Sequence, residues 1–182
     1  MSLTWAPALE RPDLLAEPVR HALEAMASDG ADVAAVEVTE IDPDHADTAV
    51  LVEATGWDLR DMANCIVISG ARAGEERVCA ALVLGHTRAD VNKAVRKRLD
   101  VRKCSFMPMD EAVGRSGMEY GGITPVGVPS GWPVLVDARV VQREHIVIGS
   151  GLRRSKLRLP GALAARLPGA EVVEDLALEP PT

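Results

Sequence analysis

The chain has 182 residues, a net charge of −7 and 47% hydrophobic residues, which is typical of one folded domain and excludes a disordered chain. No apolar run approaches the ~20 residues that a membrane-spanning helix needs, and Met1–Arg20 lacks the pattern of a signal peptide. Cys65, Cys79 and Cys104 are widely spaced and indicate neither a zinc site nor a disulfide framework. We therefore expect a single domain over residues 1–182, located in the cytoplasm, with no metal and no other cofactor.

The N-terminal part of the chain predicts two helices separated by a strand. A helix is expected from Pro18 to Gly30, where apolar residues recur at helical spacing. The alternating stretch Ala34–Ile41 is rich in β-formers and predicts a strand. A second helix is expected between an N-cap at Asp47 and a stop at Gly56, with three buried apolar residues: Val50, Leu51 and Ala54.

The central part predicts two buried strands and a basic helix. The continuous apolar runs Cys65–Ser69 and Val78–Leu84 are typical of strands covered on both faces. The polar stretch Gly70–Glu76 between them predicts a hairpin with a long turn. A helix capped by Asp90 follows, with its bases outward.

Short elements are expected after residue 103. The strand predictions cover Cys104–Met107, Pro133–Val136 with Val140–Val141, His145–Ile148 and Lys156–Leu159. The helix predictions begin at an Asp110 cap and span Ala162–Leu167, and the acidic tail Glu171–Thr182 is expected to be frayed. Because neighbouring strands are joined by short hairpins, we expect an α+β fold with a mixed, strongly curved sheet flanked by helices.

Charge is unevenly distributed along the chain. Residues 1–63 hold fourteen of the 27 acidic residues, and seven bases gather between Arg88 and Lys103. The net negative charge argues against non-specific nucleic-acid binding, so DNA is not an expected partner. The basic stretch is either an ordinary solvated helix face or a surface that binds a polyanion. Its candidate phosphate-binding residues are Arg88, Lys93, Arg96, Lys97, Arg102 and Lys103.

The stretch Gly117–Gly127 holds four glycines and one proline in eleven residues. Such a loop is either a tight structural corner or a binding loop that lets a ligand approach the backbone. Gly121, Gly122 and Pro125 form its centre, and their backbone groups can orient a polar ligand or stabilise an oxyanion without an ionisable side chain. Thr124 adds a hydroxyl group.

Other candidate groups follow two later strands. Gly149 and Ser150 can offer backbone and hydroxyl groups from another wall of a site. Asp137 breaks an apolar run and is either solvated on an edge or the partner of a polar site. No histidine has metal-ligand spacing, and His86, which follows a strand, is either a surface residue or a functional one. Neither a nucleophile elbow nor a phosphate-binding glycine motif is present.

Several of these segments together resemble a known family. The run Gly117–Gly127, the strand Pro133–Asp137 and the stretch Ile148–Gly151 resemble the YbaK / prolyl-tRNA synthetase-associated domain, whose G-x-x-x-P loop is matched by Gly121 and Pro125. The stretch Ala81–Lys93 is similar to the strand, turn and helix that precede that loop, and the resemblance covers about residues 30–168. It implies a sheet curved toward a barrel.

The resemblance implies hydrolysis of the ester that joins a wrong amino acid to tRNA. Gly121, Gly122 and Pro125 would then act on the ester, and substrate would contact Asn64, Thr124, Asp137, Gly149 and Ser150. The expected partners are the acceptor end of aminoacyl-tRNA and an aminoacyl-tRNA synthetase. Asn64 stands where many family members have a lysine that helps to hold the substrate. A module that binds tRNA or an amino acid without catalysis is therefore the alternative, and an unrelated small-molecule pocket is a third.

Overall fold

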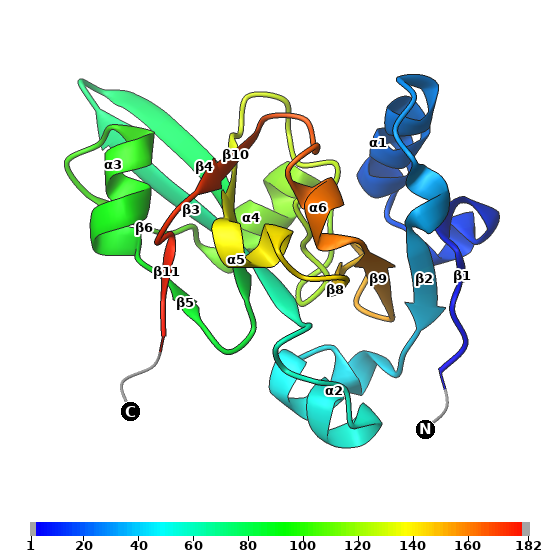
Figure 1. Ribbon diagram of the computed structural model, residues 1–182. Coiled ribbons are helices and arrows are strands. Elements are labelled where there is room, and N and C mark those ends of the chain that lie inside the picture. The colour runs from blue at the N-terminus through cyan, green and yellow to red at the C-terminus, as the bar shows by residue number, and fades with distance from the viewer. Residues whose placement is uncertain (1–2, 180–182) are drawn as a thin grey trace.

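The computed structural model describes residues 3–179 and contains three β-sheets with helices around them (Figure 1). The strand orders are β10-β7-β4-β3-β6, β1-β2-β9-β8 and β11-β5. The strands are β1 (Ala6–Pro7), β2 (Glu37–Glu40), β3 (Ala63–Arg72), β4 (Glu75–Leu84), β5 (Arg88–Ala89), β6 (Cys104–Phe106), β7 (Val134–Asp137), β8 (Ile146–Gly149), β9 (Ser155–Leu159), β10 (Ala170–Val173) and β11 (Ala177–Leu178).

The helices are short except for the first. They are α1 (Glu17–Ser28), α2 (Thr48–Thr55), α3 (Arg96–Leu99), α4 (Met109–Ser116), α5 (Ala138–Val141) and α6 (Gly161–Ala164). A π-helical segment, Val91–Val95, runs directly into α3. Single 3-10 turns cover Ala8–Glu10, Pro12–Leu14, Val33–Ala35 and Pro43–His45.

The predicted α+β class and the mixed sheet are confirmed. Strand β7 pairs in parallel with both β4 and β10, whereas β3 pairs antiparallel with β4 and β6. The five-stranded and four-stranded sheets remain separate, and a single bridge between Met62 and Val147 joins the start of β3 to β8. The sheets therefore do not close into a barrel.

The β3–β4 hairpin is longer than predicted, and its turn is tighter. The strands continue to Arg72 and from Glu75, so that only Ala73 and Gly74 form the turn. Both turn residues have positive φ, 52° and 84°, which suits the right-handed twist of a two-residue hairpin. The prediction of a loop over Gly70–Glu76 was wrong because polar, exposed residues continue the pairing beyond the buried part of the sheet.

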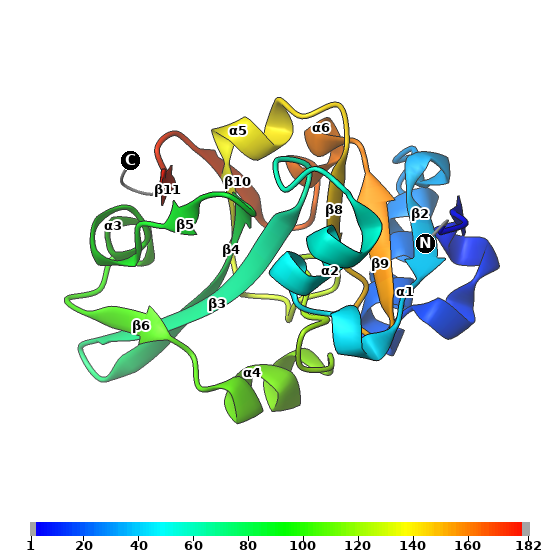
Figure 2. The same ribbon diagram turned by 90° about the horizontal axis from the view of Figure 1, so that it is seen from below.

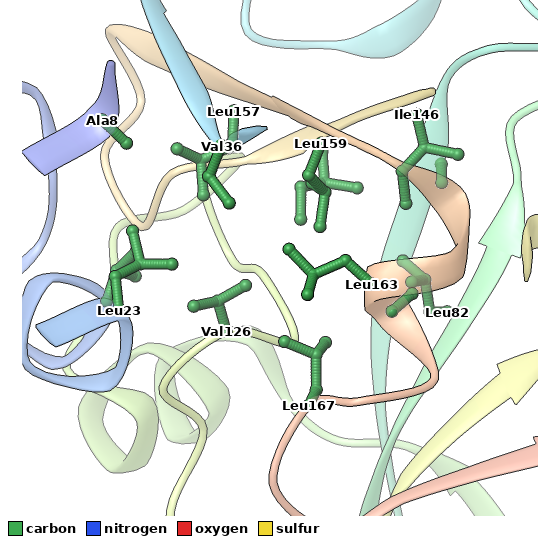
Figure 3. Packing of buried hydrophobic residues seen from close by; sticks show 14 of the residues in the cluster. Ala8, Leu23, Val36, Leu82, Val126, Ile146, Leu157, Leu159, Leu163 and Leu167 are labelled. Carbon is green, nitrogen blue, oxygen red and sulfur yellow. The ribbon is translucent and has the colours of Figure 1, made fainter. Parts of the chain in front are cut away.

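The core lies on both faces of β3 and β4. The largest cluster joins the four-stranded sheet, α1 and α6 to one face, as the packing of Leu23, Leu82, Ile146 and Leu163 in Figure 3 shows. A second cluster on the other face packs β3 and β4 against Val95 and Leu99. These two residues belong to the helical residues 91–99, which we call the basic segment. Strand residues alternate between these clusters, which explains the continuous apolar runs in the sequence.

Three predicted features of the second half were wrong. Val140–Val141 belongs to α5 because Asp137 accepts a hydrogen bond from the Arg139 amide and starts a helix at that point. Helix α4 begins at Met109, so Asp110 lies inside the helix and is not its cap. The tail is not frayed up to Leu178: β10 extends the five-stranded sheet and β11 pairs with β5, while residues 180–182 lie outside the described part.

The helices divide between the two sides of β3. In the view of Figure 2, α2 and α4 lie on the lower right side of β3, and α3 lies on its upper left side. The packing agrees, because Ala112 of α4 contacts the cluster of Val67 and Val78, whereas Leu99 of α3 contacts the cluster of Ile68 and Cys79. Val50 of α2 was predicted to be buried but is 41% exposed, because α2 covers the sheet through Leu51.

Candidate functional site

A cleft of about 890 Å³ opens on the α2 and α4 side of β3. Its walls come from segments that are far apart in the sequence: the start of α2, the first half of β3, the β6–α4 connection, the glycine loop, the end of β8 and one residue of β9. Three of the residues predicted to form a site line this cleft: Asn64, Gly121 and Gly149. The fold thus brings together strand ends and a loop that the sequence separates by more than eighty positions.

The glycine loop is held by its own backbone against the chain that follows β8. The Gly122 amide donates to the Glu119 carbonyl at 3.0 Å, and the Gly122 carbonyl accepts from the Gly151 amide at 2.8 Å. The Glu119 amide in turn donates to the Gly151 carbonyl at 2.8 Å. Both backbone groups of Gly122 are therefore used inside the protein, and Gly122 is buried.

The residues on either side of Gly122 differ from it in their backbone hydrogen bonding. Gly121 and Ile123 both line it, and neither amide donates to an acceptor within residues 3–179. Gly121 has a φ of +77°, a left-handed conformation that favours glycine. Gly122 therefore forms the tight corner that the sequence offered as one alternative, and the residues on either side of it line the cleft with amides that have no acceptor among residues 3–179. The binding role of the loop stays a prediction.

Gly149 shows how closely β8 approaches this loop. A Cβ atom added to Gly149 would lie 2.2 Å from the carbonyl oxygen of Gly122, and one added to Gly122 would lie 2.6 Å from the backbone of Leu152. Side chains cannot be accommodated at these distances because the opposing atoms belong to the backbone. The two glycines permit the contact that positions the loop.

Asn64 lies near the start of β3 with its amide group in the cleft wall. The Thr48 hydroxyl donates to the Asn64 Oδ1 atom at 2.8 Å, which orients the amide group. The Asn64 Nδ2 group has no acceptor among the described residues and remains available as a donor. Helix α2 thus fixes the direction in which Asn64 can bind a ligand.

Lys156 is the cleft residue that sequence reasoning missed. It lies on β9, only 5% exposed, and it is the one lysine or arginine among the residues that line the cleft. Its Nζ atom donates to the Ala46 carbonyl at 2.9 Å and reaches the Gly121 carbonyl at 3.5 Å. Burial lowers the pKa of Lys156 from 10.5 to about 8, with Asp47 opposing the shift and Arg153 adding to it.

The remaining residues predicted to bind or act on substrate lie outside the cleft lining. Thr124 and Pro125 are buried residues of the glycine loop, and the Thr124 hydroxyl has no hydrogen-bond partner among residues 3–179. The Ser150 hydroxyl bonds to the Ser155 hydroxyl at 2.7 Å and to backbone atoms, because it points away from the cleft that Gly149 faces.

Asp137 holds the end of the five-stranded sheet. It is buried, binds the Arg139 guanidinium through both carboxylate oxygens, and accepts from the Ala177 amide at 2.8 Å. Burial raises its pKa, but the hydrogen bonds from Arg139 and Ala177 outweigh this effect, so that the pKa is lowered. Asp137 is therefore not solvated on an edge. Its polar partners are Arg139 and the Ala177 amide of the same chain.

The six candidate phosphate-binding residues are all exposed. Within the described part of the chain none of them forms an ion pair, whereas their neighbour Arg98 pairs with Glu171. None of them lines the cleft. The basic segment, with Lys93, Arg96 and Lys97, lies on the α3 side of β3, whereas the cleft lies on the α2 and α4 side.

Other reactive groups offer little chemistry. His86 is half-buried with an unpartnered Nδ1 atom and does not line the cleft. Cys65 does line it, but burial raises the pKa of its thiol to about 12, which disfavours the nucleophilic thiolate. Between residues 3 and 179 no cluster of three metal-ligating side chains occurs, and no helix is long and apolar enough to cross a membrane.

The sequence of the cleft region matches a known family. A family model for the aminoacyl-tRNA editing domain matches residues 42–167, which is more than half of the chain and includes every cleft-lining residue. The chain belongs to the aminoacyl-tRNA editing domain family. Its membership confirms the resemblance to YbaK-like proteins and supports a function of the tRNA-editing type.

Solved structures with the editing-domain fold superpose over most of the chain. A protein described as a candidate trans-editing enzyme for prolyl-tRNA synthetase has a TM-score of 0.70 and 20% identity, covering 88% of this chain and 97% of that one. A hypothetical protein has a TM-score of 0.71 and 19% identity, and the match covers 85% of this chain and 97% of that protein. A candidate signal transduction protein from Marinobacter aquaeolei VT8 has a TM-score of 0.60 and 19% identity, and the match covers 89% of this chain and 30% of that protein. At these identities the likeness concerns the fold. A search of curated proteins found no match.

Proposed function

We propose that this editing-domain protein acts in trans as an aminoacyl-tRNA deacylase, which hydrolyses the ester between a tRNA and a wrongly attached amino acid. One observation carries the proposal: two unused backbone amides, at Gly121 and Ile123, line the same cleft as the donor groups of Asn64 and Lys156. Several hydrogen-bond donors that line one cleft suit the stabilisation of an oxyanion.

The proposed reaction needs only positioning and charge stabilisation from the protein. Water adds to the ester carbonyl carbon, and the negative charge that develops on the carbonyl oxygen is stabilised by N–H groups of the glycine loop. The bond to the ribose oxygen then breaks, and the proton from the water ends on that oxygen. By resemblance to the family, a ribose hydroxyl of the tRNA assists the water. Rigid loop geometry is thus the protein's main contribution.

Lys156 has two roles in this proposal. Its ammonium ties the chain before α2 to the Gly121 carbonyl, which holds the glycine loop at a fixed distance from the cleft wall. It also supplies a positive charge in a site where Asn64 stands in place of the lysine that many family members have. A charged donor in a poorly solvated site stabilises developing negative charge more than a neutral donor does.

A deacylation assay on a panel of mischarged tRNAs tests the function. Each tRNA carries one labelled amino acid, and its release is compared with the rate in buffer and with the rate of the Gly149→Ala variant purified in the same way. The proposal expects release above both backgrounds for at least one amino acid. No release above background for any amino acid would contradict it.

Asn64 motivates a second candidate, a module that binds the acceptor end of tRNA or an amino acid without cleaving the ester. Titration of tRNA at two salt concentrations separates the candidates. Salt-sensitive tRNA binding without turnover favours the binding module, and turnover excludes it. An association with an aminoacyl-tRNA synthetase would fit either candidate, because both act on that enzyme's product.

A further inference from the structure

The only phenylalanine and the only tyrosine of the chain are both exposed residues of the cleft lining. They are Phe106 and Tyr120, which are 63% and 58% exposed. The three tryptophans are placed differently: Trp132 is buried, and Trp5 and Trp57 stack on each other. The chain thus exposes its two remaining aromatic rings beside the cleft, where they lose the stabilisation that burial would give.

Each ring is attached to a fixed backbone. Phe106 ends β6, whose pairing with β3 places Phe106 opposite Ile68, and its ring has no aromatic or cationic partner within residues 3–179. Tyr120 lies in the glycine loop, and the Arg153 guanidinium lies 5.4 Å from its ring centre. The Arg153 amide donates to the Glu119 carboxylate at 2.6 Å, and the Arg153 guanidinium reaches the Tyr120 carbonyl at 3.5 Å. Figure 2 shows β6 leading directly toward α4 along the edge of β3.

The segment that leads into β6 is basic. Arg102 and Lys103 precede β6 directly, both are exposed, and neither forms an ion pair within the described part of the chain. Flat aromatic faces next to free cations suit a ligand that carries both π-faces and negative charges, which is the chemistry of single-stranded nucleic acid. A purely apolar protein surface would satisfy the rings but would leave these cations without partners.

We propose that Phe106 and Tyr120 form a stacking platform for the terminal unpaired bases of the tRNA 3′ end, with Arg102 and Lys103 facing the adjoining phosphates. This inference rests on the proposed function, because an ester on the terminal ribose places the last base one sugar away from the cleft interior. The platform explains how a substrate could be held when the basic residues themselves lie outside the cleft. It also assigns a role to the exposed β6 end that catalysis does not use.

Binding of an uncharged RNA hairpin tests the platform without requiring ester hydrolysis. One hairpin carries an acceptor-type stem with its unpaired 3′ tail, and a second lacks only the last nucleotide. The dissociation constant of each is measured by fluorescence anisotropy with the wild-type protein and with Phe106→Leu, Phe106→Tyr and Val172→Ala. Val172 is 43% exposed and lies on β10 outside the cleft lining, so its variant is the matched control.

The platform predicts that removal of the last nucleotide weakens wild-type binding by about tenfold, in the range that stacking on one aromatic ring provides. Phe106→Leu should weaken binding of the full hairpin by about the same factor and leave the shortened hairpin unaffected. Phe106→Tyr and Val172→Ala should resemble the wild type. A 2-aminopurine placed at the last position should change its fluorescence with the wild type and not with Phe106→Leu.

Three outcomes would overturn the inference: no RNA binding at low salt, equal binding of the two hairpins, or an equal loss for both hairpins in Phe106→Leu. In the last case the ring would serve another partner, such as an apolar protein surface. Because neither hairpin carries an amino acid, the binding measurement can be interpreted even if the deacylation assay detects no activity. Stacking without turnover would support the binding module and retain the platform.

Discussion

The two sides of β3 present different surfaces. On the α2 and α4 side a cleft is lined mainly by apolar groups and backbone, and its only lysine or arginine is the buried Lys156. On the α3 side the exposed bases Lys93, Arg96 and Lys97 have no ion-pair partners among the described residues. Under the proposed function, attraction of the tRNA phosphates and chemistry on the ester would belong to separate parts of one small protein. Each prediction below alters one side and measures whether the other responds.

The largest effect is expected from Gly149→Ala. The added Cβ would lie 2.2 Å from the Gly122 carbonyl oxygen, so either the glycine loop or β8 must move. A displacement of this size should lower kcat/KM of deacylation by about 100-fold or more, because misplacement by about 1 Å has that effect. The salt dependence of tRNA binding should change little, since the bases on the α3 side are untouched.

Gly114→Ala is the matched control for this substitution. Gly114 lies in α4, and an added Cβ there meets nothing within 4 Å. The variant should keep full activity and gain up to about 1 kcal/mol of stability from helix propensity. Steady-state kinetics and thermal unfolding are measured on both proteins. Equal activity of Gly149→Ala and wild type would show that the glycine loop is not the site.

Lys156→Met should produce the next largest effect. Loss of a charged donor should lower kcat/KM by roughly 10- to 100-fold, the value of a hydrogen bond to a charged group. Wild-type activity should fall as the pH rises above about 8, where the ammonium loses its proton, and the variant should lack this step. Arg158→Met removes a cation from the same strand outside the cleft and should leave the pH profile unchanged. The same alkaline step in Lys156→Met would refute the assignment.

The same substitution has a stability signature of defined sign. Between pH 8 and 10.5 the unfolded chain keeps the Lys156 proton that the folded chain has released. The free energy of unfolding of the wild type should therefore rise with pH across this window relative to Lys156→Met, and the difference should be constant below pH 8. Urea unfolding at a series of pH values measures it.

The smallest effect on catalysis is expected on the α3 side. The double substitution Arg96→Gln with Lys97→Gln should leave kcat unchanged and reduce the slope of log affinity against log salt by about one for each lost phosphate contact. Arg11→Gln with Arg20→Gln changes the net charge equally, but those residues lie outside the basic segment in ion pairs with Asp13 and Glu24. If the two double variants show the same salt dependence of tRNA affinity, the basic segment does not contact the tRNA phosphates.

The sequence predicted those features that depend on local patterns. Helix α1 begins within one residue of Pro18, and its three apolar residues at helical spacing, Val19, Leu23 and Met26, are buried as their periodicity indicates. The buried strands β3 and β4 and the N-caps at Asp47 and Asp90 were also predicted. Each depends on residues within about ten positions of one another, so tertiary context was not needed.

The missed features depend on distant contacts. Lys156 and Arg158 alternate with apolar residues in β9, which in sequence indicates a solvent-facing side of a strand. Lys156 is buried instead because β9 is an interior strand, with β2 and β8 on its two sides, and because the chain before α2 covers that end of it. Ser150 was expected in the cleft beside Gly149, but consecutive residues at a strand end point to opposite faces.

The pairing of β10 with β7 has a consequence for the order in which the chain can fold during synthesis. The outermost strand of the five-stranded sheet and the Ala177 amide that binds Asp137 both come from the last part of the described chain. Until those residues leave the ribosome, β7 has an unpaired edge and the Asp137 carboxylate lacks one of its donors. The nascent chain therefore carries an open sheet edge until β10 has been synthesised, and such an edge can pair with another chain.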